Sequence, residues 1–231
     1  MVLEEGILAG CTLNKSLHME ESNDIAELDR RSSMTLLSDP VDIFSHCCRA
    51  ALCEKDIELK VEYVSEEEDA ERISAHNPYS ELPTLIDREI SLYDMSVITE
   101  YLDERYPYPP LMPVDPVVRA KARLLVFRMT RDWLDPLHGL GPGNWRKPPR
   151  VLKESLLGGF VSMAPIVSSQ AFFLGSEFSI VDAYMAPLLW RLPAMGIQLP
   201  TTADPIQKYA RRLFVRQSFQ DSLSEAERAM R

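Results

Sequence analysis

The sequence predicts two domains in succession, an α/β domain and then a domain built only from helices, and three observations carry that prediction. The chain has 231 residues, and single domains usually hold about 100 to 150 residues. Residues 34–106 alternate strand-like and helix-like patterns, whereas residues 117–231 carry only helical periodicity. Residues 107–116 are rich in proline, which suits a linker between two domains.

The segments of the first domain follow one another in an informative order. The expected strands are Met34–Leu37, Lys60–Val64 and two that join at a polar turn within Leu82–Leu92. The expected helices are Ile43–Lys55, Glu66–His76 and Ser96–Arg105. Pro78 should end the middle helix, because proline disfavours helical geometry in the residue before it. Strand, helix, strand, helix, strand, strand and helix is the order of a thioredoxin-like domain.

The second domain is predicted to be all-helical, because no convincing strand pattern follows the linker. Its expected helices are Val117–Asp135, Val151–Ser168, Ile180–Leu192 and Pro205–Arg216. At the other end of the chain, residues 1–33 carry acidic and small polar residues without a sustained period. We expect those residues to form a flexible extension.

Charge and composition exclude several classes of function. The chain has 25 Lys and Arg residues against 35 Asp and Glu residues, a net charge of −10 that repels a phosphate backbone. Direct nucleic-acid binding is therefore not expected. No window holds the roughly 18 to 20 apolar residues of a membrane span, and the N-terminus lacks the positive flank of a secretory signal. We expect a cytoplasmic protein that does not bind a membrane.

The cysteines predict neither a disulfide framework nor a metal site. Cys11, Cys47, Cys48 and Cys53 include no C-x-x-C pair, so reduced thiols are the simplest interpretation. His46 precedes two of them, but adjacent residues on one helix point about 100° apart, and such side chains do not converge on one ion. We expect a partly buried helix face here, with no metal and no cofactor.

Two local motifs resemble those of the cytosolic glutathione transferases. Leu82 and Pro83 are similar to the segment in which that superfamily places a cis-proline before a strand. Phe178–Tyr184 is similar to its buried capping box. In such a box Ser179 accepts from the amide of Asp182, and Asp182 accepts from the amide of Ser179. The box stabilises the fold by about 1 to 2 kcal/mol and has no catalytic role.

A more specific resemblance is to the stringent starvation protein A family, and it extends from Met34 to Arg231. The motifs that carry it are Met34–Leu36, Ser45–His46, Pro83–Glu89, Glu100–Arg105, Pro109–Val114, Ala186–Pro193 and Ser224–Arg228. The resemblance implies a glutathione-transferase-like architecture in a homodimer. It also implies a partner, RNA polymerase holoenzyme with the primary sigma factor, whose transcription the protein redirects in stress without turning over glutathione.

The resemblance also locates the positions at which a transferase would hold glutathione. Asp42 stands where thiol-bearing relatives place their cysteine, and a carboxylate there raises the pKa of a nearby thiol rather than activating it. It directly precedes a helix, so an N-cap role is expected. Leu82 and Pro83 match the segment that pairs with the peptide-like ligand. Asp94 and Met95 match an acid–serine pair, but methionine cannot donate a hydrogen bond to the ligand's carboxylate.

Two other functions stay open from the sequence alone. A glutathione-dependent transferase or isomerase would use a serine near the first helix, and the available hydroxyls are Ser38, Ser45 and, with a shifted register, Ser96. Alternatively, the protein is a dimeric scaffold for other regulators, contacted through the acidic residues Glu66–Glu71 and through residues 1–33.

The expected partner-binding site is Pro107, Tyr108, Pro109 and Pro110. Prolines fix their own backbone angles and hold the residues before them extended, so little entropy remains to be lost on binding. The resemblance implies activity for a Pro-His-Pro at this place, and this chain has tyrosine where the family has histidine. Tyrosine keeps a planar ring with a polar tip but carries no positive charge. A plain interdomain linker is the alternative interpretation.

Overall fold

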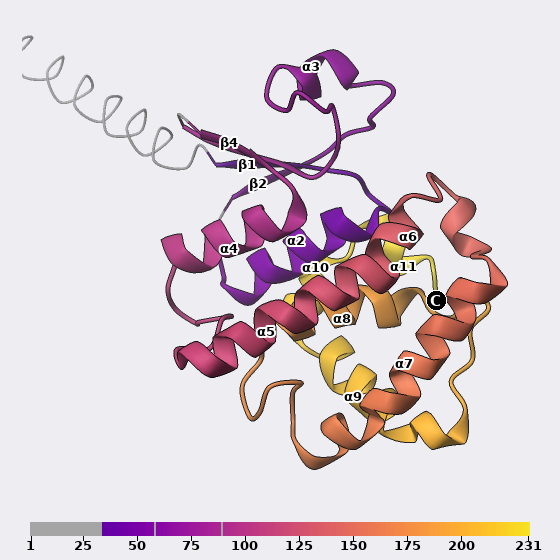
Figure 1. Cartoon of the computed structure of the whole chain (residues 1–231). Helices are drawn as coiled ribbons and strands as arrows, with labels where there is room; N and C mark the ends of the chain where they lie inside the picture. Colours follow the sequence, from indigo (N-terminus) through magenta and orange to yellow (C-terminus); the bar gives the residue numbers. More distant parts are fainter. Residues whose placement is uncertain (1–33, 58, 89) are drawn as a thin grey trace, which may run out of the picture.

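The computed structural model describes residues 34–57, 59–88 and 90–231. The extension predicted over residues 1–33 lies outside these ranges. Figure 1 shows a four-stranded sheet with helices, followed by a bundle of helices. The predicted order of domains is therefore confirmed: a thioredoxin-like α/β domain precedes an all-helical domain.

The first domain is a mixed sheet with helices on both faces. Its elements are β1 (Thr35–Ser38), α2 (Ile43–Glu54), β2 (Lys60–Tyr63), α3 (Ala70–Ser74), β3 (Thr84–Asp87), β4 (Ile90–Tyr93) and α4 (Met95–Arg105). The strand order is β2-β1-β3-β4, with β1 parallel to β2 and antiparallel to β3, and with β3 antiparallel to β4. Figure 1 places α2 and α4 on one face of the sheet and α3 on the other.

Alternation along β1 divides the core between these two faces. Leu36 pairs with Leu85 in the register of β1 and β3, and both belong to the large core beneath the sheet. Leu37 points to the opposite face, because successive side chains of a strand alternate. There it packs with Ile73 and Leu82 in a small core under α3.

The helix expected over Glu66–His76 is wrong in length, since α3 covers only Ala70–Ser74. The preceding residues form a turn in which the amide of Asp69 donates to the carbonyl oxygen of Ser65 at 2.9 Å. The carboxylate of Asp69 accepts in return from the amide of Ser65 at 3.0 Å. An Asp side chain that bonds to nearby backbone in this way competes with helix formation.

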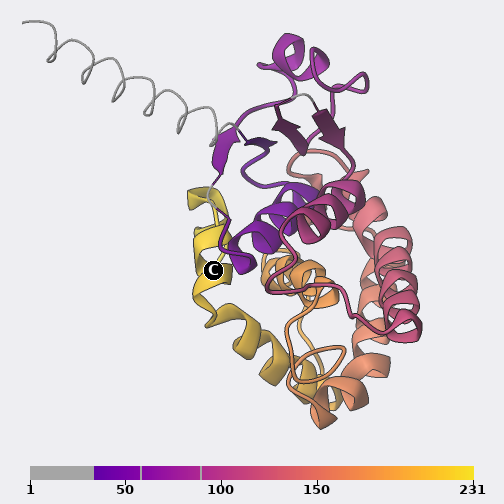
Figure 2. The same cartoon turned by 90° about the vertical axis from the view of Figure 1, so that its left-hand side faces the viewer.

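The second domain contains every predicted helix, with small differences at the ends. Its elements are α5 (Pro116–Met129), the π-helix η1 (Thr130–Leu134), α6 (Asp135–His138), the short η2 (Asn144–Arg146), α7 (Arg150–Ser169), α8 (Ile180–Arg191), η3 (Thr201–Ala203), α9 (Asp204–Phe214), α10 (Gln217–Ser222) and α11 (Glu225–Arg228). The sequence did not predict α10 or α11, which are too short to show a helical period. Helix α10 packs against α2, and Figure 2 shows the C-terminal part of the chain, in yellow, next to the first domain.

Helix α8 is the centre of the second domain, and all of its residues are buried. Its capping box is present: the Asp182 carboxylate accepts from the amide of Ser179 at 2.9 Å and from the hydroxyl of Ser179 at 2.6 Å. It also accepts from the amide of Phe173 and the hydroxyl of Tyr209. Although burial raises the pKa of Asp182, these donors counteract the rise.

Helix α7 differs from the sequence-based expectation about membrane spans. One window of α7 has a mean hydropathy of 1.3, so by length and composition this helix could cross a membrane. Core helices of soluble proteins have the same property, and α7 packs against α9 and η3. Only 28% of the window is buried in the fold.

A buried cluster of charges joins the two domains. Glu227 of α11 accepts from Arg49 of α2 at 2.7 Å and from Arg191 of α8 at 2.5 Å. Arg191 also donates from Nη1 to Nδ1 of His46 at 2.8 Å. Since a guanidinium only donates, the hydrogen of the neutral imidazole lies on Nε2 and is donated to the hydroxyl of Ser222 at 3.1 Å. All five side chains are buried.

Burial and charge fix the protonation of this cluster. Burial lowers the pKa of His46 to about 4, so the imidazole is neutral near neutral pH. Burial alone would raise the pKa of Glu227, but the facing guanidinium groups of Arg191 and Arg49 hold it well below its usual range. The cluster therefore holds two cations and one anion. The rings of Tyr63 and Trp145 lie 5.4 and 5.8 Å from the two guanidinium carbons and partly compensate the excess positive charge.

Replacing Glu227 by Gln should reduce the free energy of unfolding by about 3 to 5 kcal/mol, because two buried guanidinium groups would lose their counter-ion. Urea denaturation followed by circular dichroism measures the change. Glu225→Gln is the matched control, since Glu225 is exposed on the same helix and its loss should stay within about 0.5 kcal/mol. A loss below about 1 kcal/mol for the Glu227 variant would show that the cluster does not hold the domains together.

Candidate functional site

The proline-rich connector between α4 and α5 is exposed at the surface. The side chains of residues 107–110 all face solvent, and Tyr108 is 83% exposed. The peptide bond between Tyr108 and Pro109 is cis. The next two residues, Leu111 and Met112, are buried in the core. The ring of Tyr108 therefore faces solvent, and the two residues that follow the connector are buried in the core.

A buried ion pair fixes the connector from below. Lys55, at the end of α2, contacts the carboxylate of Asp103 at 2.7 Å and donates to the carbonyl oxygen of Pro109 at 2.7 Å. The Asp103 carboxylate also accepts from the amides of Leu111 and Met112 at 2.7 and 3.0 Å. Because Lys55 has no exposed side-chain surface, these bonds are shielded from water. The connector is therefore an anchored segment of the surface.

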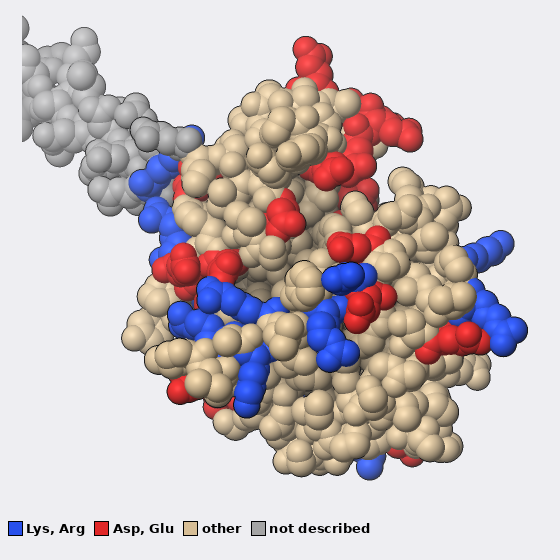
Figure 3. Space-filling view, viewed as in Figure 1, with Lys and Arg blue, Asp and Glu red and all other residues tan. Residues whose placement is uncertain are grey.

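A surface cavity of about 260 Å³ opens beside Tyr108. Pro107, Tyr108 and Pro110 form one side, and the rest is formed by Met112, Val114 and charged residues of α4 and α5. The charged residues are Glu100, Asp103, Glu104, Arg119 and Arg123. Figure 3 shows basic side chains gathered over α5 with acidic side chains beside them. A partner here meets an aromatic ring next to charges of both signs.

Asp42, the first of the expected glutathione positions, is an N-cap bonded to the second domain. Its Oδ2 accepts from the amide of Ser45 at 2.7 Å, which caps α2. Its Oδ1 lies 2.8 Å from Nδ1 of His138 on α6. The hydrogen bond to Asp42 is the main cause of a raised pKa at His138, and burial opposes it. Both oxygens of the carboxylate are thus bonded to groups within the protein.

The backbone that would pair with a peptide-like ligand is already bonded. The peptide bond between Leu82 and Pro83 is cis, as the resemblance implied. The amide of Leu82 donates to Oε1 of Glu66 at 3.0 Å. A side-chain carboxylate thus holds the amide that a glutathione backbone would need.

The acid–serine position is occupied by a second N-cap. Asp94 accepts from the amides of Ser96 and Val97 at 2.8 and 3.1 Å, and also from the hydroxyl of Ser96. Met95 is buried in the core of the first domain. Met95 therefore offers no donor, and the shifted hydroxyl of Ser96 is bonded to Asp94.

The other two candidate hydroxyls, unlike the exposed Ser96, are buried. Ser38 accepts from Arg49 and donates to the carbonyl oxygen of Asp39. Ser45 accepts from the amide of Asp39 at 3.1 Å. Neither serine has exposed surface. Neither is placed to activate a bound thiol.

The expected glutathione positions do not share one cavity. Asp42 lines a cavity of about 120 Å³ between the domains, whereas Asp94 and Met95 line a separate one of about 280 Å³ between α4, α5 and α8. The rings of Phe44 and His138 stack at 4.4 Å, and each ring lines one of the two cavities. The cleft between the domains is thus divided.

Comparison with known proteins identifies the family. The family model described as glutathione S-transferase, N-terminal domain, matches residues 42–110. A stringent starvation protein A homolog of Coxiella burnetii is 40% identical over 203 residues, covering 87% of this chain and 97% of the relative. One from Pasteurella multocida is 42% identical over 196 residues, covering 84% and 92%. This chain belongs to the stringent starvation protein A family.

More distant relatives and solved structures place this family member within the wider superfamily. A maleylacetoacetate isomerase of Pseudomonas aeruginosa is 28% identical, covering 54% of this chain and 63% of that protein. A glutathione S-transferase of Rhodospirillum rubrum has a TM-score of 0.73 at 21% identity, covering 83% and 92%. FzlA from C. crescentus has a TM-score of 0.72 at 22% identity, covering 82% and 91%. These likenesses at low identity describe the shared fold.

The three thiols that the structure of this stringent starvation protein A family member describes, those of Cys47, Cys48 and Cys53, have raised pKa values and are therefore not activated. Cys47 and Cys48 have no exposed surface, and burial raises the pKa of both well above the usual range. Burial raises the pKa of Cys53 to about 11. Within the described ranges no three His, Cys, Asp or Glu residues are arranged to hold a metal ion. Cys11 lies outside those ranges.

The residues that hold the connector and the expected glutathione positions in place could not be predicted from the sequence. Glu66 was expected in a solvated acidic helix, and nothing local indicates that it reaches Leu82, which is 16 residues away. Lys55 and Asp103 belong to separate helices with ordinary surface composition. His138 lies three residues beyond Asp135, where the sequence predicted the end of a helix. Only the fold brings these partners together.

The His138–Asp42 pair should stabilise the protein in a pH-dependent way. A folded-state pKa above the ordinary 6.5 means that the contribution is full below that pH and is lost as pH rises through the folded pKa. Asp42→Asn removes the charge but keeps an N-cap side chain. The loss in thermal midpoint should therefore be larger at about pH 6 than at about pH 9.

Asp94→Asn is the matched control, because Asp94 is also an N-cap but bonds to no histidine. Its effect should be the same at both pH values. Equal losses for the Asp42 variant at both pH values, or a titration of His138 at or below 6.5 by nuclear magnetic resonance, would contradict the assignment.

Proposed function

We propose that this protein is an RNA-polymerase-associated regulator of transcription in stress and starvation. It binds the holoenzyme that carries the primary sigma factor, and it does not turn over glutathione. The observation that carries the proposal is Tyr108, an exposed ring on an anchored connector, at the place where the family resemblance implies a contact with a partner. The names of the relatives support the setting in starvation.

The anchoring of the connector supports a role in binding. Its backbone is bonded through Lys55 and Asp103, so the segment is ordered before any partner arrives. Binding then costs little conformational entropy. Tyrosine is among the residues that most often act as anchors at protein interfaces, because its ring offers a large apolar area and its hydroxyl a polar tip.

The state of the glutathione positions supports a function other than transfer chemistry. The amide of Leu82 is bonded to Glu66, and Asp94 caps its own helix. Met95 is buried, and the serines at positions 38 and 45 have no exposed surface. A ligand would have to displace these internal bonds, and each of the three candidate serines, Ser38, Ser45 and Ser96, is already hydrogen-bonded within the protein.

A glutathione-dependent transferase or isomerase is the second candidate function. It is favoured by the Leu82–Thr84 segment, which is similar to that of the glutathione transferases, and by the isomerase among the distant relatives. Exposed Glu66 would have to release the amide of Leu82 for the tripeptide to bind. That step separates this candidate from the proposed function.

We propose further that the protein works as a homodimer in the cytoplasm and contacts polymerase rather than DNA. Apolar side chains on neighbouring elements support a subunit contact: Ile90 of β4, Val97 of α4, and Leu124 and Phe127 of α5 are each between 41% and 58% exposed. The net charge of −10 disfavours a direct approach to DNA.

Replacing Pro107, Tyr108 and Pro109 together by alanine should weaken the binding of purified holoenzyme by about 2 kcal/mol, or roughly thirtyfold. The thermal midpoint should stay nearly unchanged, because these side chains are exposed and the carbonyl that accepts from Lys55 is kept. Biolayer interferometry with immobilised protein measures the affinity.

Tyr79→Ala is the control, because Tyr79 is 68% exposed but lies in the loop after α3, away from the connector. It should bind holoenzyme like the native protein.

Tyr108→His should preserve most of the affinity for holoenzyme if the ring makes the contact. If the phenolic hydroxyl is needed, the variant should lose roughly 1 kcal/mol of binding free energy. A folded triple variant that binds as tightly as the native protein would reduce the connector to a linker.

A further inference from the structure

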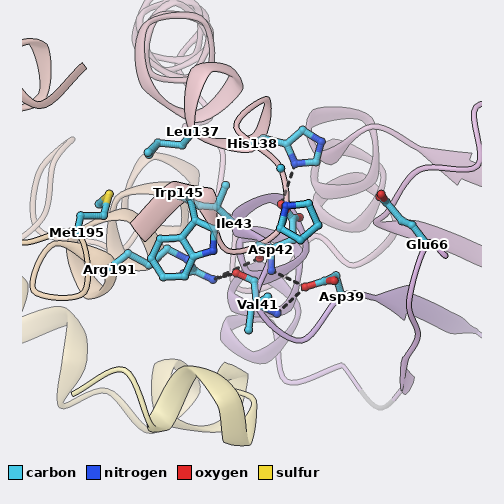
Figure 4. Close-up of a pocket in the computed structure, with 12 residues that line it drawn as sticks. Asp39, Val41, Asp42, Ile43, Glu66, Leu137, His138, Trp145, Arg191 and Met195 are labelled. Atoms are coloured by element: carbon cyan, nitrogen blue, oxygen red, sulfur yellow. Dashed lines mark hydrogen bonds and ion pairs between the residues drawn. The ribbon is translucent and has the colours of Figure 1, made fainter. Parts of the chain in front are cut away.

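The cavity between the domains holds a buried donor without a partner. It measures about 120 Å³ and is shown in Figure 4, with Arg191, Trp145 and Met195 toward one side and Asp39 and Glu66 toward the other. Arg191 is only 2% exposed, and its Nε–H has no acceptor among the described residues. A buried N–H without an acceptor is costly, so an acceptor belongs at this end.

The other bonds of Arg191 show that this N–H faces the cavity. Oε1 of Glu227 accepts from Nη2 of Arg191, and Nδ1 of His46 accepts from Nη1. These two acceptors lie 3.1 Å apart, so both face the end of the guanidinium. The remaining hydrogen of Nη2 is parallel to Nε–H. Nη2 also donates to the carbonyl oxygen of Val41 at 2.9 Å. Since Val41 lines the cavity, Nε–H points to the same side.

The opposite end of the cavity is negatively charged. Oδ1 of Asp39 accepts from the amides of Val41 and Asp42 at 2.6 and 2.7 Å. Oε1 of Glu66 accepts from Leu82. Within the described part of the chain, no donor is bonded to the second oxygen of either carboxylate. Two carboxylates with free oxygens favour an ammonium group and oppose an anion such as glutathione.

The space between the two ends is apolar and small. Ile43, Leu137, Trp145 and Met195 line it. Its volume is comparable with the engineered cavity of about 150 Å³ that binds benzene. An alkyl chain of about five carbons therefore fits the apolar part.

We propose that this cavity binds a small zwitterion with an oxygen acceptor at one end and an ammonium group at the other. The acceptor takes the hydrogen bond from Nε–H of Arg191, the alkyl chain packs beside Trp145, and the ammonium lies between Asp39 and Glu66. This site is separate from the connector at Tyr108, and its test needs no polymerase.

The probe is δ-aminovalerate, followed in a proton–nitrogen correlation spectrum at the Nε–H signal of Arg191 and the indole signal of Trp145. Both signals should shift with a Kd of about 1 mM, an ordinary affinity for so small a ligand. n-Pentylamine, which lacks the acceptor, and valerate, which lacks the ammonium, should each bind roughly tenfold more weakly.

Glu66→Gln should weaken the binding of δ-aminovalerate roughly tenfold, because the carboxylate that faces the ammonium group loses its charge. Glu67→Gln is the matched control, since Glu67 is exposed and does not line the cavity, and it should bind like the native protein. The proposal is overturned if neither signal shifts at about 20 mM probe. It is equally overturned if valerate or pentylamine binds as tightly as δ-aminovalerate, or if the Glu66 variant binds unchanged.

Discussion

The carboxylate of Glu227 is the group on which the arrangement of the two domains depends. Arg49 and His46 approach it from the α/β domain, and Arg191 approaches it from the helical domain. A buried carboxylate between two buried guanidinium groups tolerates little separation, because each charge has exchanged water for its partner. The domains are therefore held close together, and the two cavities along their contact measure about 120 and 280 Å³. Both are smaller than the roughly 300 to 1,000 Å³ usual for ligand pockets.

The groups at the expected glutathione positions are hydrogen-bonded to other groups of the protein. The amide of Leu82 is paired with Glu66, Asp94 caps its own helix, and Asp42 is shared between an N-cap and His138. Groups that would orient a thiol in an enzyme here stabilise the fold. Tyr108 differs, because its ring is exposed while its backbone is anchored. The connector is thus an ordered surface that is available for recognition, and the proposed function is therefore binding to a large partner.

The sequence predicted those features that arise from local bonds. The strands of the first domain follow from alternation, the N-cap at Asp42 from its place before a helix, and the capping box of Ser179 and Asp182 from spacing alone. Features that depend on distant partners were not predictable. Glu227 lies 178 residues from Arg49, and its helix has only four residues, too few for a periodic pattern. The acidic run before α3 was misassigned for the same reason, since its turn is held by bonds from Glu66 to Leu82 as well as by Asp69.

The central claim is that the glutathione positions are satisfied within the protein, and calorimetry with reduced glutathione tests it most directly. Native protein should give no binding heat at ligand concentrations of about 5 mM, because the amide of Leu82 is held by Glu66 and the hydroxyls of Ser38 and Ser45 are buried. Freeing that amide with Glu66→Ala should still leave binding weaker than about 1 mM, since Met95 offers no donor. Binding of glutathione to the native protein with a Kd in the micromolar range would contradict the account and favour an enzyme.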